Sequence, residues 1–289
     1  MHIVTGTRGL IGRALQENLR SAGYQVLCLD RESIDWDRLH DTRIQWIWHM
    51  GAISETNAAD WGELMELNVS STQNWIRFAE MKKCGITYAS SASLYGPWVN
   101  SPEWGPVQPQ HLYGISKLAV DNWVGQNRFT VPVQGMRFFN VYGLHEGHKA
   151  QPSPLRRFME QAQTQRRITV WNHHGRLGSR DFVSVDDCVS AMMSLSQRGA
   201  SGIFNIGTGT TLTFMDVAQL MQRHLGIPNC QIMSVPMPDE MVEKYQWDSL
   251  ANLDRLRAFL PTWNPQTMEQ WLDHNWDQLY NIVREDLQQ

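Results

Sequence analysis

Two lysines stand at positions where a site for proton transfer would use them. The chain has 5 lysines and 20 arginines, and lysine, unlike arginine, loses its proton at a reachable cost when it is partly buried. Lys117 closes the run Tyr113-Gly114-Ile115-Ser116-Lys117, and Lys149 closes the run Glu146-Gly147-His148-Lys149. We therefore expect both lysines to take part in acid–base chemistry.

Tyr113 and Lys117 are four residues apart in a predicted helix, so their side chains lie on one helix face. A lysine ammonium close to a phenol stabilises the phenolate and lowers its pKa toward neutrality. Ser91 ends a predicted strand, and its hydroxyl could bond the substrate oxygen that gains or loses the proton. Ser90 and Ser93 are the alternatives for this role.

A glycine-rich turn opens the chain. A predicted strand runs into Gly6-Thr7-Arg8-Gly9-Leu10-Ile11-Gly12, which leads into a helix. Glycines there allow a tight turn and close approach to a pyrophosphate, while the helix N-terminus offers free N–H groups. The turn therefore predicts a dinucleotide site formed by Gly6, Gly9, Leu10, Ile11 and Gly12.

Further positions complete the predicted cofactor site. Asp30, at the end of the second predicted strand, suits the ribose hydroxyls, whereas Arg31 would suit a 2′-phosphate, so both NAD and NADP stay open. Met50, Gly51 and Ala52 follow the third strand, where small residues let the cofactor backbone lie close. Asn68, on a helix facing the same edge, either bonds the loops that hold the cofactor or has a purely structural role.

The composition argues against several classes of function. The chain has 289 residues and a formal net charge of −4, and it has no basic block, so we expect no nucleic-acid partner. It has no run of about 18 apolar residues, so we expect no membrane span. No basic region followed by an apolar stretch precedes the first strand, which predicts a cytoplasmic protein.

Metal and disulfide sites are not expected either. The four cysteines (Cys28, Cys84, Cys188 and Cys230) are widely separated and form no C-x-x-C pair, which fits a reduced compartment. The His173-His174 pair has no partners at metal-ligand spacing, so we expect no metal.

The elements that must position these residues follow an alternating pattern. Short β-branched runs alternate with helical patterns through the first half, which predicts βαβ units and a parallel sheet. Strands are predicted at 2–5, 25–29, 44–48, 86–89, 132–136, 168–171 and 203–206, and helices at 10–22, 61–81, 112–126, 155–165, 186–196 and after 265. We expect residues 1–145, with segments returning near 181–210, to form the cofactor-binding core. Residues 146–289 would form mostly a substrate-binding lobe.

The order and context of the glycine turn, Ser91, Tyr113 and Lys117 resemble the extended short-chain dehydrogenase/reductases, the NAD-dependent epimerase/dehydratase family of nucleotide-sugar enzymes. The resemblance implies a Rossmann-type doubly wound parallel sheet with a smaller C-terminal α/β lobe. It implies a tightly bound, recycled NAD or NADP, a nucleotide-sugar substrate and a homo-oligomer. In that family Tyr113 would be the acid/base, Lys117 its pKa modifier and nicotinamide-ribose contact, and Ser91 the hydroxyl donor.

The run that ends at Lys149 resembles the heptose 6-epimerase branch of this family, as do Ser179 to Val183 and Tyr245-Gln246. That branch implies that Lys149 is a second acid/base, with Asn140, Arg180 and Tyr245 contacting an ADP- or GDP-manno-heptose.

Other activities are weighed against this one. A nucleotide-sugar 4-epimerase is the main alternative, because it needs Tyr113 and Lys117 but not Lys149. A dehydratase would want an acidic pair where Ala92-Ser93-Leu94 stands. A non-catalytic dinucleotide sensor typically loses the tyrosine or the lysine, and this chain keeps both.

Overall fold

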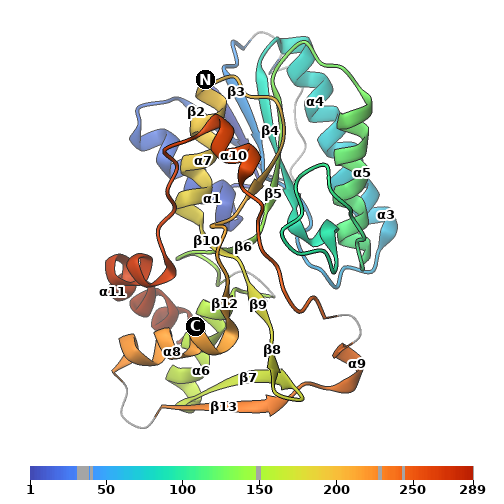
Figure 1. Cartoon of the computed structure of the whole chain (residues 1–289). Coiled ribbons are helices and arrows are strands. Elements are labelled where there is room, and N and C mark those ends of the chain that lie inside the picture. The colour runs from blue at the N-terminus through green and yellow to red at the C-terminus, as the bar shows by residue number, and fades with distance from the viewer. Residues whose placement is uncertain (31–38, 40–41, 148–150, 227–229, 243–244, 289) are drawn as a thin grey trace.

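A six-stranded parallel sheet forms the centre of the larger part of the molecule (Figure 1). The computed structural model describes all residues except 31–38, 40–41, 148–150, 227–229, 243–244 and 289. The strand order is β11-β5-β4-β3-β1-β2. The strands are β1 (His2–Thr5), β2 (Val26–Leu29), β3 (Trp46–His49), β4 (Gly85–Ser91), β5 (Val133–Phe138) and β11 (Gly202–Ile206).

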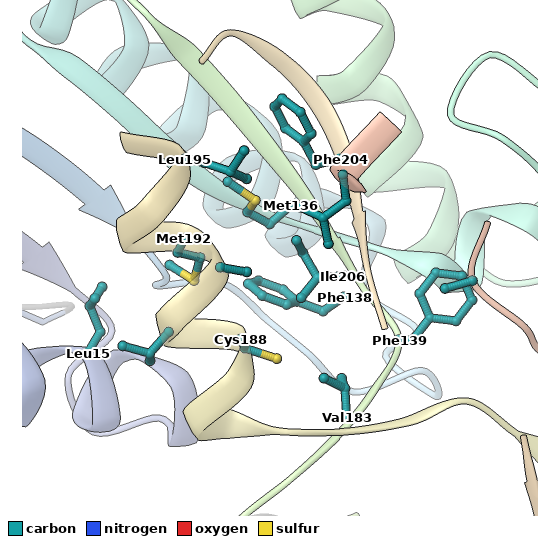
Figure 2. Packing of buried hydrophobic residues seen from close by; sticks show 14 of the residues in the cluster. Leu15, Met136, Phe138, Phe139, Val183, Cys188, Met192, Leu195, Phe204 and Ile206 are labelled. Atoms are coloured by element: carbon teal, nitrogen blue, oxygen red, sulfur yellow. The ribbon is translucent and has the colours of Figure 1, made fainter. Parts of the chain in front are cut away.

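Helices cover both faces of this sheet (Figure 1). On one face lie α1 (Leu10–Ser21) and α7 (Val185–Gln197); on the other lie α3 (Trp61–Leu64), a π-helical turn (Met65–Ser70), α4 (Ser71–Lys82) and α5 (Leu112–Gln126). Figure 2 shows side chains of α7, such as Met192 and Leu195, packed against Met136 of β5 and Phe204 of β11. Because helices cover both faces, nearly every position of β1, β3, β4 and β5 is buried.

The order of the strands reverses direction at β1. β1 lies between β2 and β3. The chain first passes from β1 to β2 on one side and then crosses back past β1 to β3 on the other side. Doubly wound sheets bind ligands at the carboxyl ends of the strands flanking such a point. The predicted α/β class with a parallel Rossmann-type sheet is confirmed.

The later part of the chain builds a smaller α/β unit below the sheet in Figure 1. A three-stranded sheet pairs β7 with β13 in parallel and with β8 in antiparallel, and three helices share an apolar core with it. The elements are β7 (Arg167–His173), β8 (Arg176–Leu177), β13 (Gln231–Pro236), α6 (Pro154–Gln165), α8 (Phe214–Leu225) and α11 (Met268–Asp286).

Short paired strands join the two units. β6 (Asn140–Tyr142) pairs with β10 (Phe182–Ser184), and β9 (Ser179–Arg180) pairs with β12 (Leu212–Thr213). The remaining elements are a 3-10 turn (Ala92–Tyr95), α9 (Asp239–Val242) and α10 (Asp254–Phe259), and α10 returns to pack on β11.

One predicted helix differs in part from the observed one, and several observed elements were not predicted. The helix predicted at 61–81 contains the π-helical turn at Met65–Ser70, and α8, α9, α10, β6, β8, β9, β10, β12 and β13 were not predicted. None of the helices in the described part of the chain has the length and apolar character needed to cross a bilayer.

Candidate active site

Helix α5 presents Tyr113 and Lys117 to the end of β4. The Tyr113 hydroxyl and the Ser91 side chain share a hydrogen bond. Lys117 Nζ donates to the Ala89 carbonyl oxygen at 2.8 Å and lies 5.7 Å from the centroid of the Tyr113 ring. The helix spacing thus brings phenol, ammonium and hydroxyl together.

Burial moves the proton affinities of this pair in opposite directions. Desolvation lowers the pKa of Lys117 to about 8, although the Asp121 carboxylate acts in the opposite sense. Desolvation also raises the pKa of Tyr113, which the Ser91 hydrogen bond partly counters. A lysine that gives up its proton near neutral pH beside a phenol suits reversible proton transfer.

The three serines at or just after the end of β4, Ser90, Ser91 and Ser93, have different partners. Ser90 Oγ donates to Asp121 Oδ2 at 3.0 Å, away from Tyr113. Ser91 Oγ donates to Ser93 Oγ at 2.9 Å and also bonds Tyr113. Of the three serines weighed from the sequence, Ser91 is the one bonded to Tyr113.

The glycine turn forms a close backbone crossing. Gly6 has φ +69°, and a Cβ there would lie 2.5 Å from the Gly51 nitrogen. The ends of β1 and β3 can therefore come this close only because residue 6 is a glycine. A Cβ on Gly12 would collide with the Gly6 carbonyl oxygen. Gly9 begins α1 without a side-chain cap. This open backbone at a helix N-terminus fits a dinucleotide pyrophosphate.

Asp30 lies against this turn. Its carboxylate accepts hydrogen bonds from the Thr7 nitrogen and the Thr7 hydroxyl, both at 2.9 Å, and pairs with Arg8 Nε at 3.3 Å. An acid beside the turn fits the ribose of a dinucleotide. Arg31, the predicted alternative for a 2′-phosphate, lies outside the described residues.

The other predicted cofactor residues divide into two groups. Ile11, Met50 and Ala52 line a cavity at the carboxyl edge of the sheet. Leu10 is buried in the core instead. Asn68 is also fully buried: its amide bonds both backbone groups of Ile53, and its Nδ2 donates to Ser116 Oγ. Asn68 therefore fixes the loop after β3 to helix α5.

The cavity has a volume of about 540 Å³ and lies between the sheet edge and the smaller unit. The sheet side contributes Ser91, Tyr113 and Lys117, and the opposite side contributes Asn140, Arg180 and Tyr245. All six residues were predicted as site residues, and they share one cavity.

Arg180 is held in place on the lobe side. Its Nη1 donates to the carbonyl oxygens of Ser179 at 2.9 Å and Trp247 at 2.7 Å, and its guanidinium lies 5.0 Å from the Tyr245 ring centroid. Burial lowers its pKa. Asn140 Oδ1 accepts a hydrogen bond from Ser249 at 3.3 Å. A rigid guanidinium at a cavity wall suits a diphosphate.

Lys149 lies outside the described residues, but the chain on both sides of it is placed. Val141 and Gln151 both line the cavity. Glu146, which is fully buried, accepts hydrogen bonds from the nitrogens of Gly143 at 3.1 Å and Ser153 at 2.7 Å. Gly143 and Ser153, which precede and follow Lys149 in the chain, are thus joined through Glu146.

Two further residues near this site, His111 and His49, were not predicted from the sequence. His111 caps α5 by accepting from the Gly114 nitrogen, and its ring stacks on Tyr113. Its place directly before the predicted helix would have suggested the cap. His49 bonds Thr5 Oγ1 at 2.8 Å at the end of β3; nothing in the sequence pairs these two residues.

Among the described residues, the predicted His173-His174 pair is not part of a metal site. The His173 and His174 rings contact each other in the smaller unit. Within the described ranges, no three or more His, Cys, Asp or Glu side chains form a group that could hold a metal ion.

Comparison with known proteins places this arrangement in a family. Residues 2–207 match the NAD dependent epimerase/dehydratase family. An ADP-L-glycero-D-manno-heptose-6-epimerase of Brachyspira hyodysenteriae is 29% identical over 89% of this chain and 91% of its own length.

Solved structures share the fold. The Helicobacter pylori ADP-L-glycero-D-manno-heptose-6-epimerase has a TM-score of 0.85 at 20% identity, covering 96% of both chains. A Thermus thermophilus UDP-glucose 4-epimerase in complex with NAD has a TM-score of 0.78 at 20% identity, covering 99% of both. Since the family match spans well over half of the sequence, the predicted family is confirmed, and the chain belongs to the NAD-dependent epimerase/dehydratase family.

Proposed function

We propose that this protein is an NAD-dependent epimerase of a nucleotide-activated sugar, and that it inverts C6 of an ADP- or GDP-manno-heptose through a transient ketone. One observation carries the proposal: Tyr113, Lys117 and Ser91 share a cavity of about 540 Å³ with Arg180, Asn140 and Tyr245. The similarity to the Brachyspira heptose epimerase supports the choice of sugar.

The residues present fit NAD as the cofactor. The crossing of Gly6 and Gly51 leaves room for a pyrophosphate at the start of α1, and Asp30 would exchange its bonds to Thr7 for the ribose hydroxyls. Ile11, Met50 and Ala52 would line the path toward Lys117. Bound NAD would supply a hydride acceptor at the sugar carbinol and return the hydride.

Tyr113 would move the proton on one side of the sugar. Its hydroxyl already bonds Ser91, whose Oγ would turn toward the sugar oxygen, while Lys117 stabilises the phenolate. Both side chains are buried, so bulk water would not compete for the proton.

Epimerisation through a ketone needs a second proton donor. The sugar oxygen lies on opposite sides of the carbon before and after the reaction, and Tyr113 serves one side. Lys149 would serve the other. The lining positions of Val141 and Gln151, on either side of it in the chain, support this assignment.

The smaller unit would bind the nucleotide diphosphate. Arg180 would contact phosphate oxygens, with Tyr245 and Asn140 beside it. In this proposal residues 1–145, with the returning segments near 181–210, hold the cofactor, and residues 146–289 mostly hold the sugar nucleotide.

The decisive experiment is a substrate comparison. The purified protein with NAD is incubated with each C6 epimer of ADP- and GDP-manno-heptose, and the anomeric and C6 protons are followed by NMR. Interconversion of the epimers of one nucleotide is expected. Turnover of a UDP-hexose without turnover of either heptose would replace the proposal with a 4-epimerase.

The two-base mechanism has its own test. Lys149→Ala should abolish epimerisation but leave oxidation of one epimer in a single-turnover assay, because Tyr113 still serves that side. Equal loss of oxidation from both epimers would contradict a separate role for Lys149.

A further inference from the structure

A buried carboxylate lies one helical turn beyond the catalytic pair. Helix α5 presents Tyr113, Lys117 and Asp121 at intervals of four residues, so the three side chains share one face. Tyr113 bonds Ser91, Lys117 bonds the Ala89 carbonyl and Asp121 bonds Ser90. Asp121 is 2% exposed and lies behind the cavity wall, where no substrate would touch it.

Three donors from two strands fix the Asp121 carboxylate. Tyr88 donates to Oδ1 at 2.9 Å, Ser90 donates to Oδ2 at 3.0 Å, and Arg137 Nε donates to Oδ2 at 2.8 Å. Arg137 is itself buried and also donates to the Tyr95 hydroxyl. These hydrogen bonds from β4 and β5 hold the Asp121 carboxylate of α5 in one orientation against the sheet.

This carboxylate faces two buried cations. Arg137 pairs with it directly, and the Lys117 ammonium lies one turn away on the same helix. Two cations out of water need a compensating anion, since the protein interior screens charges poorly. Asp121 opposes the effect of burial on Lys117.

Three other titratable groups around this centre, His49, Tyr88 and Tyr95, carry no charge near neutral pH. His49 on β3 is neutral at physiological pH because burial lowers its pKa to about 3. Tyr88 and Tyr95 stay protonated because burial raises their pKa values. Glu103 has other partners: its Oε1 accepts a hydrogen bond from the Asn205 nitrogen, and its carbonyl oxygen accepts one from Arg137 Nη1.

We propose that Asp121 is a positioning residue of the active site, which acts through Lys117 by keeping it charged beside Tyr113. Asp121 thereby sets the upper end of the pH range in which Tyr113 exchanges protons. The catalytic part of this inference rests on the function proposed above; the effect on Lys117 does not.

The test is a direct titration of Lys117. With only five lysines in the chain, ¹³C labelling of lysine Cε gives few NMR signals, and single substitutions assign them. Asp121→Asn keeps the shape of the side chain and removes its charge. We expect the pKa of Lys117 to fall by about one to three units in this variant. The alkaline limb of kcat should shift by the same amount, with KM for the sugar nucleotide unchanged.

Tyr88→Phe is the matched control. It removes one hydrogen bond from Asp121 but leaves the charge, so Lys117 should titrate as in the parent protein. A purely structural role for Asp121 would lower stability in both variants without moving the Lys117 titration. An unchanged Lys117 pKa in Asp121→Asn would therefore overturn the proposal.

A second variant covers the case in which Asp121→Asn does not fold. Asp121→Asn with Arg137→Met removes the cation that would be left unpaired, and the Lys117 pKa should still fall. The NMR titration needs no substrate. A protein that turns over no sugar nucleotide would therefore count against the proposed function, while the Lys117 titration would still decide the role of Asp121.

Discussion

At the scale of single residues, the site depends on groups whose proton affinities are moved by burial. Burial raises the pKa of Tyr113, so the phenol alone would be a poor base near neutral pH. The Lys117 ammonium lies over the Tyr113 ring, 5.7 Å from its centroid. Its contribution should therefore appear in both the rate and the pH dependence of the reaction.

Lys117→Met tests this contribution. Loss of the ammonium should lower kcat by about 10²- to 10⁴-fold, and the residual rate should rise with pH, because only hydroxide would then ionise Tyr113. The pH dependence of kcat measures both effects. Lys83→Met, at an exposed position at the end of α4, is the control. Comparable losses of kcat in the two variants would contradict a specific role for Lys117.

His49 gives a prediction for stability. Burial, and secondarily the charge of Lys117, lower its pKa from 6.5 to about 3. Between these pH values the unfolded chain binds a proton that the folded protein does not, so stability falls as the pH falls below 6.5. At pH 5.5 the loss from this residue should be about 1.4 kcal/mol.

The measurement is urea unfolding of the cofactor-free protein at pH 7.5 and pH 5.5. His49→Gln retains a polar partner for Thr5 and removes the titration. Its free energy of unfolding should fall less on acidification than that of the parent, by about 1.4 kcal/mol. Equal losses in the two proteins would show that His49 does not titrate as its burial requires.

At the scale of elements, the cofactor site depends on how closely β1, β3 and α1 meet. Thr5 Oγ1 accepts a hydrogen bond from the Gly51 nitrogen at 3.1 Å, which joins the two strand ends. Asn68 then ties the following loop to α5. Side-chain hydrogen bonds thus join these elements, and the crossings at Gly6 and Gly12 leave no room for a Cβ.

Gly12→Ala should break this arrangement. The new Cβ would collide with the Gly6 carbonyl oxygen, and overpacking of this kind costs about 1–3 kcal/mol. The turn must shift to relieve this collision, which moves the backbone that would hold the pyrophosphate, so the affinity for NAD should weaken by roughly 5- to 150-fold. Calorimetric titration with NAD measures the change.

Gly125→Ala is the comparison, because a Cβ at this position in α5 meets nothing within 4 Å. It should leave NAD affinity unchanged and stabilise the helix by about 0.5–1 kcal/mol. Unchanged NAD binding in Gly12→Ala would mean that the turn does not hold the pyrophosphate.

The sequence predicted the elements whose signals are local. Helix α5 was predicted with its observed bounds, Leu112–Gln126, because its pattern lies within the segment itself. β13 was missed because Gln231–Pro236 is largely exposed and has no alternation of apolar residues; it is a strand through its parallel pairing with β7, some 60 residues earlier in the chain.

The site shows the same division. The spacing of Tyr113 and Lys117 was enough to predict their role. Asp121 could not be predicted, because its environment is made by contacts with β4 and β5. The π-helical turn at Asn68 could not be predicted either, because the bonds of its side chain to Ile53 and Ser116 bridge separate segments. Lys149 and Arg31 stay predictions, since both lie outside the described residues.

At the scale of the whole molecule, the cavity exists because the chain crosses between the two units several times. Asp181, next to Arg180, is fully buried. It accepts hydrogen bonds from the backbone nitrogens of Thr208, Gly209 and Ala251. Two returning segments, one at 208–209 and one at Ala251, are thus joined at one carboxylate. Arg180, next to it, is fixed on the far side of the cavity from Tyr113. A ligand that reaches both should bind the two units together.

Thermal unfolding with successive ligands tests this coupling. A ligand at about 100 times its Kd stabilises the folded state by about 2.7 kcal/mol, or roughly 4–5 °C in Tm for a chain of this size. NAD alone should give one increment, and a sugar nucleotide added to the NAD complex should give a second. Arg180→Met should keep the first increment and lose most of the second, because the guanidinium is proposed to bind the sugar nucleotide and not NAD. Were the second increment to survive in Arg180→Met, the nucleotide diphosphate would have to bind elsewhere, and the cavity would hold the cofactor alone.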